Sequence, residues 1–256
     1  MISTLSAART IYVRNLKKMA RTPIVIFFSL FQPLLFLLLL GQSFKRLADL
    51  PGFPYASYLA FFAPSVIMLT ALNSSLQSGM GTVDDIESGF LDKLLTAPIR
   101  RSAVLLGKIM SDGTRILLQG AMVIGVSYAL GFRVETGLSG IVLMVAIAAG
   151  FGVAWAGLSN IVALRSRNSE ATMMFGIILS FPILFLSNAM MPEQLLPDWL
   201  KTVSDYNPAS YMITALRALA NSGFDWSVLG QAAVIIAAVG LLTFAGAVRL
   251  FRKVAV

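Results

Sequence analysis

The feature that most constrains this chain is a series of long stretches that carry no charged residue. A helix needs roughly 20 apolar residues to cross the ~30 Å hydrocarbon layer of a bilayer. The stretches predict six transmembrane helices, at about 24–44, 57–79, 108–132, 138–164, 171–191 and 228–250. The third is the shortest, because its charge-free part covers only 116–132, so it crosses the layer only if its helix begins a turn or two earlier.

These stretches predict helices rather than barrel strands. Backbone amides find no water in lipid, so only helices and closed barrels satisfy them there. Barrel strands alternate apolar and polar residues over about ten positions, whereas runs such as LLFLLLL and VLMVAIAA do not alternate. Because 57% of the residues are hydrophobic and only 12% are charged, we expect one all-α integral membrane domain over residues 1–256.

The basic residues predict the orientation. With six spans, both termini lie on one side of the membrane, and that side carries 15 of the 20 Lys and Arg residues. The opposite side carries Lys45, Arg46, Arg133, Lys201 and Arg217. Since basic residues favour the cytoplasmic side, we expect both termini in the cytoplasm. The net charge of +8 is then explained by the orientation of the chain in the membrane, and we expect no nucleic-acid partner.

The residue types exclude several kinds of site. The chain has no cysteine and no histidine, which removes thiolate metal sites, the commonest metal ligand and the commonest general base. It contains no G-x-x-x-x-G-K-[ST] phosphate loop, no H-E-x-x-H and no G-x-S-x-G. We therefore expect no catalytic residues, no bound metal and no cofactor held by this chain.

Few charges stand near the predicted spans. Lys108, Asp112 and Arg115 fall on one face of the run leading into the third span, where they can neutralise one another. This interpretation is favoured over a proton relay. No lone carboxylate stands in the middle of a span, which argues against a proton- or sodium-coupled carrier.

Small residues and prolines mark packing and bending sites. Ala146, Gly150 and Ala154 recur every fourth residue and allow close helix approach. Packing within one bundle is favoured over a subunit interface. Pro33 and Pro182 predict kinks in the first and fifth spans.

The segment 4–21 is predicted to form an amphipathic helix in the membrane interface. Its apolar residues recur at spacings of three and four, at Leu5, Ala8, Tyr12, Leu16 and Met19. Its basic residues fall on the other side, at Arg14, Lys17, Lys18 and Arg21. The alternative is an ordinary positively charged flank with no docking role.

The cytoplasmic connection after the second span predicts a second amphipathic helix. Its apolar face comprises Val83, Ile86, Phe90 and Leu94, and its acids, at Asp84, Asp85, Glu87 and Asp92, lie largely elsewhere. Pro98 is expected to end this helix. Such a helix can dock a soluble partner, or it can pack beneath its own bundle, and the pattern alone leaves both open.

The outer connection 191–226 is too long for a plain turn. Trp199 follows Pro197-Asp198 at the start of one short helix, and Asn207 and Pro208 fit the N-cap and first position of another. Tyr211 begins an apolar stripe in this second helix. We expect two short re-entrant helices between the fifth and sixth spans.

Two stretches carry a resemblance to a known family. ESGFLDKLLTAPIRRSAVLLGKI (87–109) resembles the cytoplasmic coupling segment of ABC-2 type transporter permeases, and NPASYMITALRAL (207–219) resembles their signature before the last helix. The likeness covers nearly the whole chain and is nearest the daunorubicin-exporter-like branch of these bacterial drug and polysaccharide exporters.

The resemblance implies a permease subunit in a prokaryotic inner membrane that exports a drug, a lipid or a lipid-linked glycan. Separate ATPase subunits would bind ATP-Mg, and the permease would form a homodimer or pair with a similar permease within membrane lipid. The expected ATPase-docking residues are Asp84, Asp85, Glu87, Phe90, Leu91 and Leu94. The helix with Arg14, Lys17, Lys18 and Arg21 would lie beside the same partner, and the outer gate would include Trp199, Asn207, Pro208, Tyr211 and Arg217.

Two other functions remain as alternatives. An ATP-independent carrier or channel would transport without any nucleotide-binding partner. A non-transporting membrane scaffold would bind partners regardless of substrate and would not stimulate an ATPase.

Overall fold

The computed structural model describes residues 4–49, 52–96 and 101–254, and these residues form helices and turns without a strand. The long helices run α1 (Thr4–Arg21), α2 (Pro23–Ser43), α3 (Tyr58–Glu87), α5 (Arg101–Ala129), α6 (Gly137–Ser166), α7 (Ser169–Phe185) and α10 (Trp226–Val254). Shorter elements are η1 (Lys45–Asp49), α4 (Phe90–Thr96), η2 (Glu193–Leu195), α8 (Asp198–Asp205) and α9 (Pro208–Asn221).

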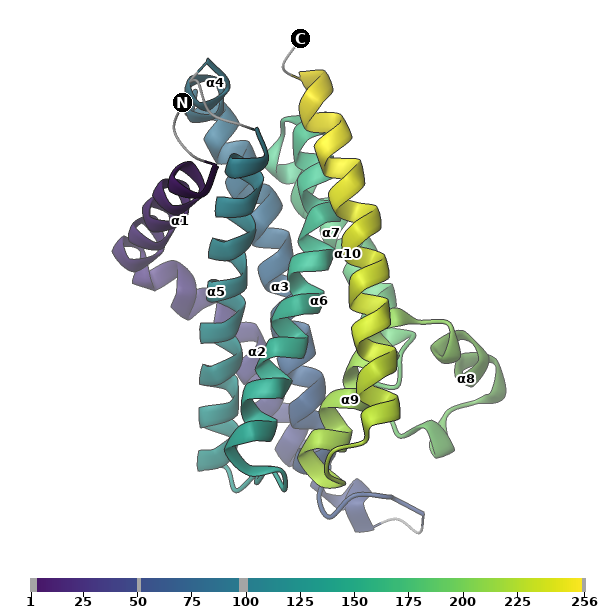
Figure 1. Ribbon diagram of the computed structural model, residues 1–256. Coiled ribbons are helices and arrows are strands. Elements are labelled where there is room, and N and C mark those ends of the chain that lie inside the picture. Colours follow the sequence, from purple (N-terminus) through teal and green to yellow (C-terminus); the bar gives the residue numbers. More distant parts are fainter. Residues whose placement is uncertain (1–3, 50–51, 97–100, 255–256) are drawn as a thin grey trace.

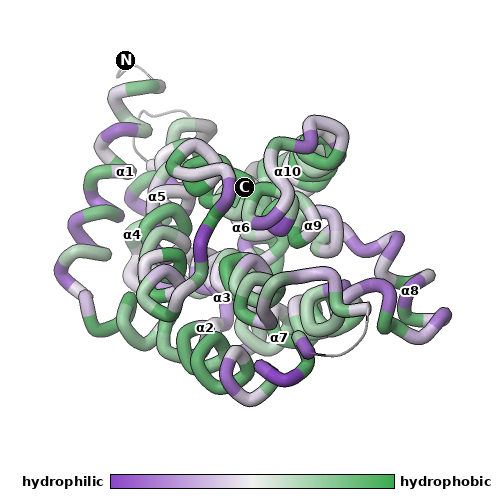
Figure 2. The backbone as a smooth tube through the Cα atoms, turned by 90° about the horizontal axis from the view of Figure 1, so that it is seen from below, coloured by the Kyte–Doolittle hydropathy of each residue, from purple (hydrophilic) through white to green (hydrophobic). Residues whose placement is uncertain are grey.

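The helices form one bundle around α3, which packs against α2, α5, α6, α7 and α9 (Figure 1). The most apolar window of α3 is 78% buried, against 22% in α2 and 17% in α10. Large apolar side chains on α2, α7 and α10 therefore remain exposed, among them Phe28, Ile178 and Leu242. Such a surface suits lipid rather than water, and Figure 2 shows hydrophobic residues along the bundle helices.

The bundle has two distinct ends. The helix α1, the turn from α3 to α4 and the last turns of α10 lie at one end in Figure 1. The turn from α5 to α6 and the tip of α9 lie at the other end, with α8 standing off the side of the bundle. We call the first the α4 end and the second the α9 end.

Four helices in the described part of the chain, α2, α3, α6 and α10, are long and apolar enough to cross a membrane by length and composition. The chain is therefore an all-α, multi-pass membrane protein. Three of the predicted spans lie in helices whose ends differ from the expected boundaries by several residues. The second continues to Glu87 rather than 79. The third begins at Arg101 rather than near 108, so its apolar part continues a longer helix. The fifth ends at Phe185 rather than 191.

A turn follows the early end of α7. Pro182 lies in the last turn, the backbone amide of Leu186 donates to Pro182 O at 2.7 Å, and Ser187 N donates to Leu184 O at 3.3 Å. These bonds tighten the chain into a turn. Residues 186–191 leave the helix and run beside α3 and α9.

Two of the three predicted small residues of α6, Gly150 and Ala154, pack against α10 inside the bundle, whereas Ala146 is exposed. Thr243 of α10 donates to Ala154 O at 2.8 Å, and a Cβ at Gly150 would lie 3.4 Å from Ile236. The close approach of α6 and α10 depends on these small residues.

Candidate functional site

The α4 end contains most of the predicted site residues, and its shape is set by Gly89. This glycine has a φ of +64°, a conformation that costs a residue with a Cβ about 1 kcal/mol or more. Its amide donates to Ile86 O at 2.9 Å, and the chain then enters α4. The prediction of one amphipathic helix from Val83 to Leu94 was wrong, because α3 continues to Glu87 and a glycine turn separates it from α4. Pro98, the expected helix end, lies outside the described residues.

The helix α1 has its predicted bounds and packs against α5. A Cβ at Gly107 would lie 2.6 Å from Ala8 O and 2.8 Å from Ile11 Cβ, so the absence of a side chain permits this contact. Ala7, Ala8 and Ile11 are buried. Leu5 is 82% exposed, so the predicted apolar stripe was wrong at its first residue.

The basic residues of α1 divide into two groups. Arg14 Nη2 lies 3.0 Å from Asp85 Oδ1, and Lys18 Nζ lies 3.4 Å from Asp84 Oδ2. These two pairs attach α1 to the last turns of α3. Lys17 and Arg21 are exposed and form no ion pair with a described residue.

The predicted docking residues also divide by exposure. Leu91 is buried among Ile11, Val104, Leu105 and Leu164, so this part of α4 packs beneath its own bundle. Glu87 and Asp84 are exposed, and Phe90 and Leu94 are half-buried. The Arg14 guanidinium lies 3.4 Å from the centre of the Phe90 ring. Docking of a partner on the exposed face of α4 stays a prediction.

We expect the Arg14–Asp85 pair to contribute modestly to stability. The side chains are 35% and 18% exposed, so solvent screens the pair and its coupling should be about 0.5–1 kcal/mol. A double-mutant cycle with Arg14→Ala and Asp85→Ala, read by unfolding in detergent, measures this coupling. The Lys18–Asp84 pair, at 52% and 56% exposure, is the matched control and should show less. Equal coupling energies for the two ion pairs would contradict the expectation that the less exposed pair contributes more to stability.

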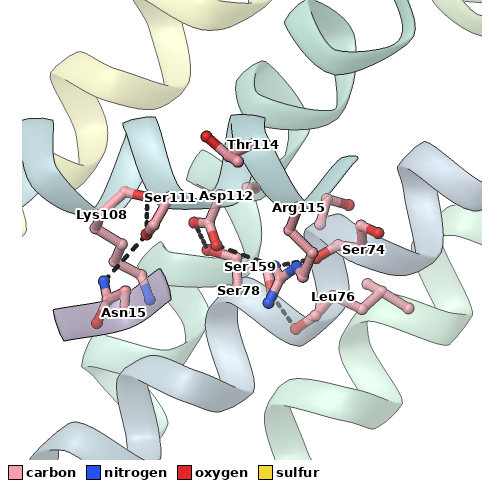
Figure 3. Close-up of polar contacts among 12 residues, drawn as sticks. Asn15, Ser74, Leu76, Ser78, Lys108, Ser111, Asp112, Thr114, Arg115 and Ser159 are labelled. Carbon is pink, nitrogen blue, oxygen red and sulfur yellow. Dashed lines mark hydrogen bonds and ion pairs between the residues drawn. The ribbon is translucent and has the colours of Figure 1, made fainter. Parts of the chain in front are cut away.

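A polar network crosses the bundle next to these helices, and the sequence analysis predicted only its Asp112–Arg115 pair (Figure 3). Arg115 Nη2 lies 3.0 Å from Asp112 Oδ1 and donates to Ser74 O at 2.8 Å. Ser78 donates to the other Asp112 oxygen, and Asn160 Nδ2 donates to Ser78 Oγ at 3.0 Å.

The network continues along α5 and α3. Gln119 accepts from Ser74 and donates to Ser29 of α2 at 2.6 Å. The signal that could have revealed it is the four-residue spacing of Ser74, Ser78 and Thr82, which places three hydroxyls on one side of α3.

The prediction that three charges of α5 neutralise one another was right for Asp112 and Arg115 and wrong for Lys108. No hydrogen-bond or ion-pair partner of Lys108 Nζ exists among the described residues. The Lys108 side chain points away from the Asp112–Arg115 pair and toward Asn15 of α1 (Figure 3).

At the α9 end, Arg217 joins three parts of the chain. It is 4% exposed and its Nε donates to Phe61 O of α3 at 3.0 Å. Its Nη2 lies 2.9 Å from Ser65 Oγ, 2.8 Å from Asn188 O and 3.2 Å from Ala189 O. Arg217 thereby provides hydrogen-bond donors for carbonyls of the non-helical segment that follows α7. Within a membrane, non-helical backbone of this kind is tolerated only where other parts of the protein bury it.

The other residues of the predicted outer gate take different positions. Asn207 caps α9 by accepting from Ala209 N at 2.9 Å, with Pro208 at the first position, as predicted. Tyr211 donates to Asp205 O at 2.8 Å and so joins α9 to α8. Trp199 is 62% exposed on α8, away from the bundle. Whether these helices form a gate stays a prediction.

Comparison with known proteins places the chain in a family. A family profile described as "ABC-2 type transporter" matches residues 6–220. The chain is 29% identical over 236 residues to the daunorubicin resistance ABC transporter permease protein DrrB1 of Streptomyces coeruleorubidus, covering 88% of this chain and 79% of the relative.

Two further relatives carry related names. The probable doxorubicin resistance ABC transporter permease protein DrrC of Mycobacterium tuberculosis is 26% identical, over 82% of this chain and 75% of the relative. The putative transport permease ycf38 of Cyanophora paradoxa is 28% identical, over 93% of this chain and 84% of the relative. The matched region contains α1, the α3–α4 turn, the polar network and Arg217. The chain therefore belongs to the ABC-2 type transporter family, as a membrane-spanning permease that is similar to permeases of the drug-resistance branch.

Proposed function

We propose that this permease is the membrane subunit of an ATP-binding cassette exporter, and that separate ATPase subunits dock at its α4 end. The exported molecule would be hydrophobic or amphipathic, leaving the cytoplasm or the inner leaflet. ATP-Mg would be bound and hydrolysed by the partner, and two such permeases, identical or similar, would form the pathway. The names of the relatives support this proposal.

The observation that carries the proposal is the mechanical continuity of α3. This helix has 30 residues, so it is about 45 Å long. At one end it is attached to α1 by two ion pairs, and the turn at Gly89 connects it to α4. At the other end Phe61 O and Ser65 Oγ contact Arg217. A partner that pushes on α4 would tilt α3, and this tilt would reach the contacts of α9.

The proposed membrane placement uses six spans, with α5 and α7 added to the four apolar helices. The charges of α5 fit this placement because Asp112 is buried against Arg115. The helix α7 has 17 residues and would be completed by the segment 186–191. The excess of basic residues at the α4 end supports a cytoplasmic position for that end and both termini, in a prokaryotic inner membrane.

The decisive substitution is Leu94→Asp, with Phe90→Asp as a second variant, in the purified complex with its ATPase. We expect ATP hydrolysis to continue while export falls about tenfold or more, which corresponds to roughly 1.4 kcal/mol of lost coupling. Vesicle transport and ATPase assays measure this. Leu94 packs against the cluster around Leu91, and Phe90 lies under Arg14, so both variants should lose some thermal stability. The loss should be smaller than in Leu91→Asp, because both side chains are only half-buried.

Leu91→Asp is the matched control, because Leu91 is 5% exposed and should lower stability rather than uncouple a folded complex. Unchanged coupling in Leu94→Asp and Phe90→Asp would remove the docking surface. Export without any ATPase would favour the carrier alternative.

A further inference from the structure

A cavity of about 310 Å³ lies between α1, α2, α3 and α5 at the α4 end. Its wall includes Lys18, Asp84, Asp85, Lys108, Asp112 and Arg115. We call it the Lys108 cavity. A liquid water occupies about 30 Å³, so the volume accommodates a phosphate group with part of its glycerol.

The wall carries three basic side chains, of Lys18, Lys108 and Arg115, and three acidic ones, of Asp84, Asp85 and Asp112. Arg14, outside the wall, adds a fourth cation to the same group. Asp84 is paired with Lys18, Asp85 with Arg14, and Asp112 with Arg115. Lys108 is the remaining cation, and its ammonium has no acceptor among the described residues. An unpaired ammonium in a poorly hydrated wall is costly. An anion in the cavity would supply its missing partner.

Other donors around the cavity are also unsatisfied. The Nε of Arg115 is buried and has no hydrogen-bond partner within the described part of the chain. The side chain of Gln77, on α3, is half-buried and likewise has no partner in that part. Lys108 and Arg115 of α5 and Gln77 of α3 all line this one cavity, and a phosphate has several oxygens that can accept from such donors.

The position of the cavity identifies the anion's source. Thr22 and Val25, at the start of α2, form part of its wall and are exposed. From there the apolar face of α2 continues with Phe28, which is 65% exposed. A molecule with its phosphate beside Lys108 can therefore lay its acyl chains along α2. We propose that the Lys108 cavity binds the phosphate group of an anionic phospholipid. The assignment of this lipid to the inner leaflet rests on the membrane placement in the proposed function, whereas the binding itself does not.

Two substitutions test the proposal by different physical routes. Lys108→Gln removes the unpaired charge. Gly81→Leu fills the space instead, because a Cβ at this position meets only Lys108 Nζ, at 4.0 Å, and leucine favours a helix. Lys108→Arg keeps the charge. The full-length permease is placed in phosphatidylcholine nanodiscs, phosphatidylglycerol is added, and bound lipid is counted by native mass spectrometry with the thermal midpoint measured in parallel.

We expect Lys108→Gln and Gly81→Leu each to weaken phosphatidylglycerol binding about tenfold, as the loss of one charge-assisted contact implies. Lys108→Arg should bind like the parent. Lys17→Gln, on the exposed side of α1, is the charge-matched control and should bind like the parent at this site. Export and ATPase activity are not part of the readout, so a failure here differs from a failure of the exporter assignment.

Three results would overturn the proposal. If Lys17→Gln weakens binding as much as Lys108→Gln, the lipid lies on the surface of α1. If inorganic phosphate raises the thermal midpoint as much as phosphatidylglycerol does, the cavity takes a soluble anion. If Gly81→Leu is folded and binds lipid like the parent, the cavity is not the site.

Discussion

Replacing Arg217 by leucine is expected to lower the free energy of unfolding by about 3 kcal/mol or more. The substitution removes the charged donor from Phe61 O, Asn188 O and Ala189 O, and a hydrogen bond to a charged group contributes about 1.5–3 kcal/mol. Phe61 O keeps its helical bond within α3. Ala189 O keeps one bond, from Ser65 Oγ. The thermal midpoint of the detergent-solubilised protein should fall by roughly 6–12 °C.

Two companion variants separate charge from geometry. Arg217→Lys keeps the charge but loses the planar fork that reaches α3 and the 186–191 segment together, so most of the stability loss should remain. Arg133→Leu is the control at the same end of the bundle. Arg133 is exposed and donates to Tyr128 O and Phe132 O, so its loss should cost about 1 kcal/mol or less. Equal effects of Arg217→Leu and Arg133→Leu would show that the three-part contact is unimportant.

Gly79→Ala is expected to separate α3 from α6 and to destabilise the bundle by about 3 kcal/mol. A Cβ at this position would lie 2.0 Å from Ser159 Oγ and 2.7 Å from Ser159 O. The hydroxyl can rotate away, but the carbonyl belongs to the backbone of α6, so the helices themselves must move. Overpacking of this kind costs about 1–3 kcal/mol and occasionally more.

Gly81→Ala is the matched control, two residues further along the same helix. Its Cβ meets only Lys108 Nζ, at 4.0 Å, so the change should be neutral or stabilise α3 by about 0.5–1 kcal/mol through helix propensity. Thermal unfolding of the two variants side by side gives the comparison. The packing argument fails if Gly79→Ala is as stable as Gly81→Ala.

Local patterns in the sequence predicted the elements that depend on neighbouring residues. The apolar runs predicted the long helices, and the apolar spacing of three and four residues predicted α1 from Thr4 to Arg21. Asn207 and Pro208 predicted the start of α9, since a cap and a first-turn proline act within one turn. Each of these features depends on residues that lie only a few positions away from it in the sequence.

The errors arose where a distant contact decides the outcome. The α3–α4 region was read as one amphipathic helix, and the break at Gly89 accompanies the burial of Leu91 against α1, α5 and α6. The fifth span was extended to 191, whereas carbonyls beyond Phe185 bind Arg217, which lies 29 residues after Asn188. Lys108 was expected to share in neutralisation, but its side chain points toward α1.

The sequence alone determined that the chain is helical and membrane-embedded and which end carries the positive charge, because hydropathy and charge are properties of the residues themselves. Only the tertiary structure decided which charges lack partners, which glycines permit helix contact and which donor satisfies the carbonyls after α7. Those outcomes depend on the distances between side chains and backbone atoms of different helices, and the order of residues along the chain does not contain these distances.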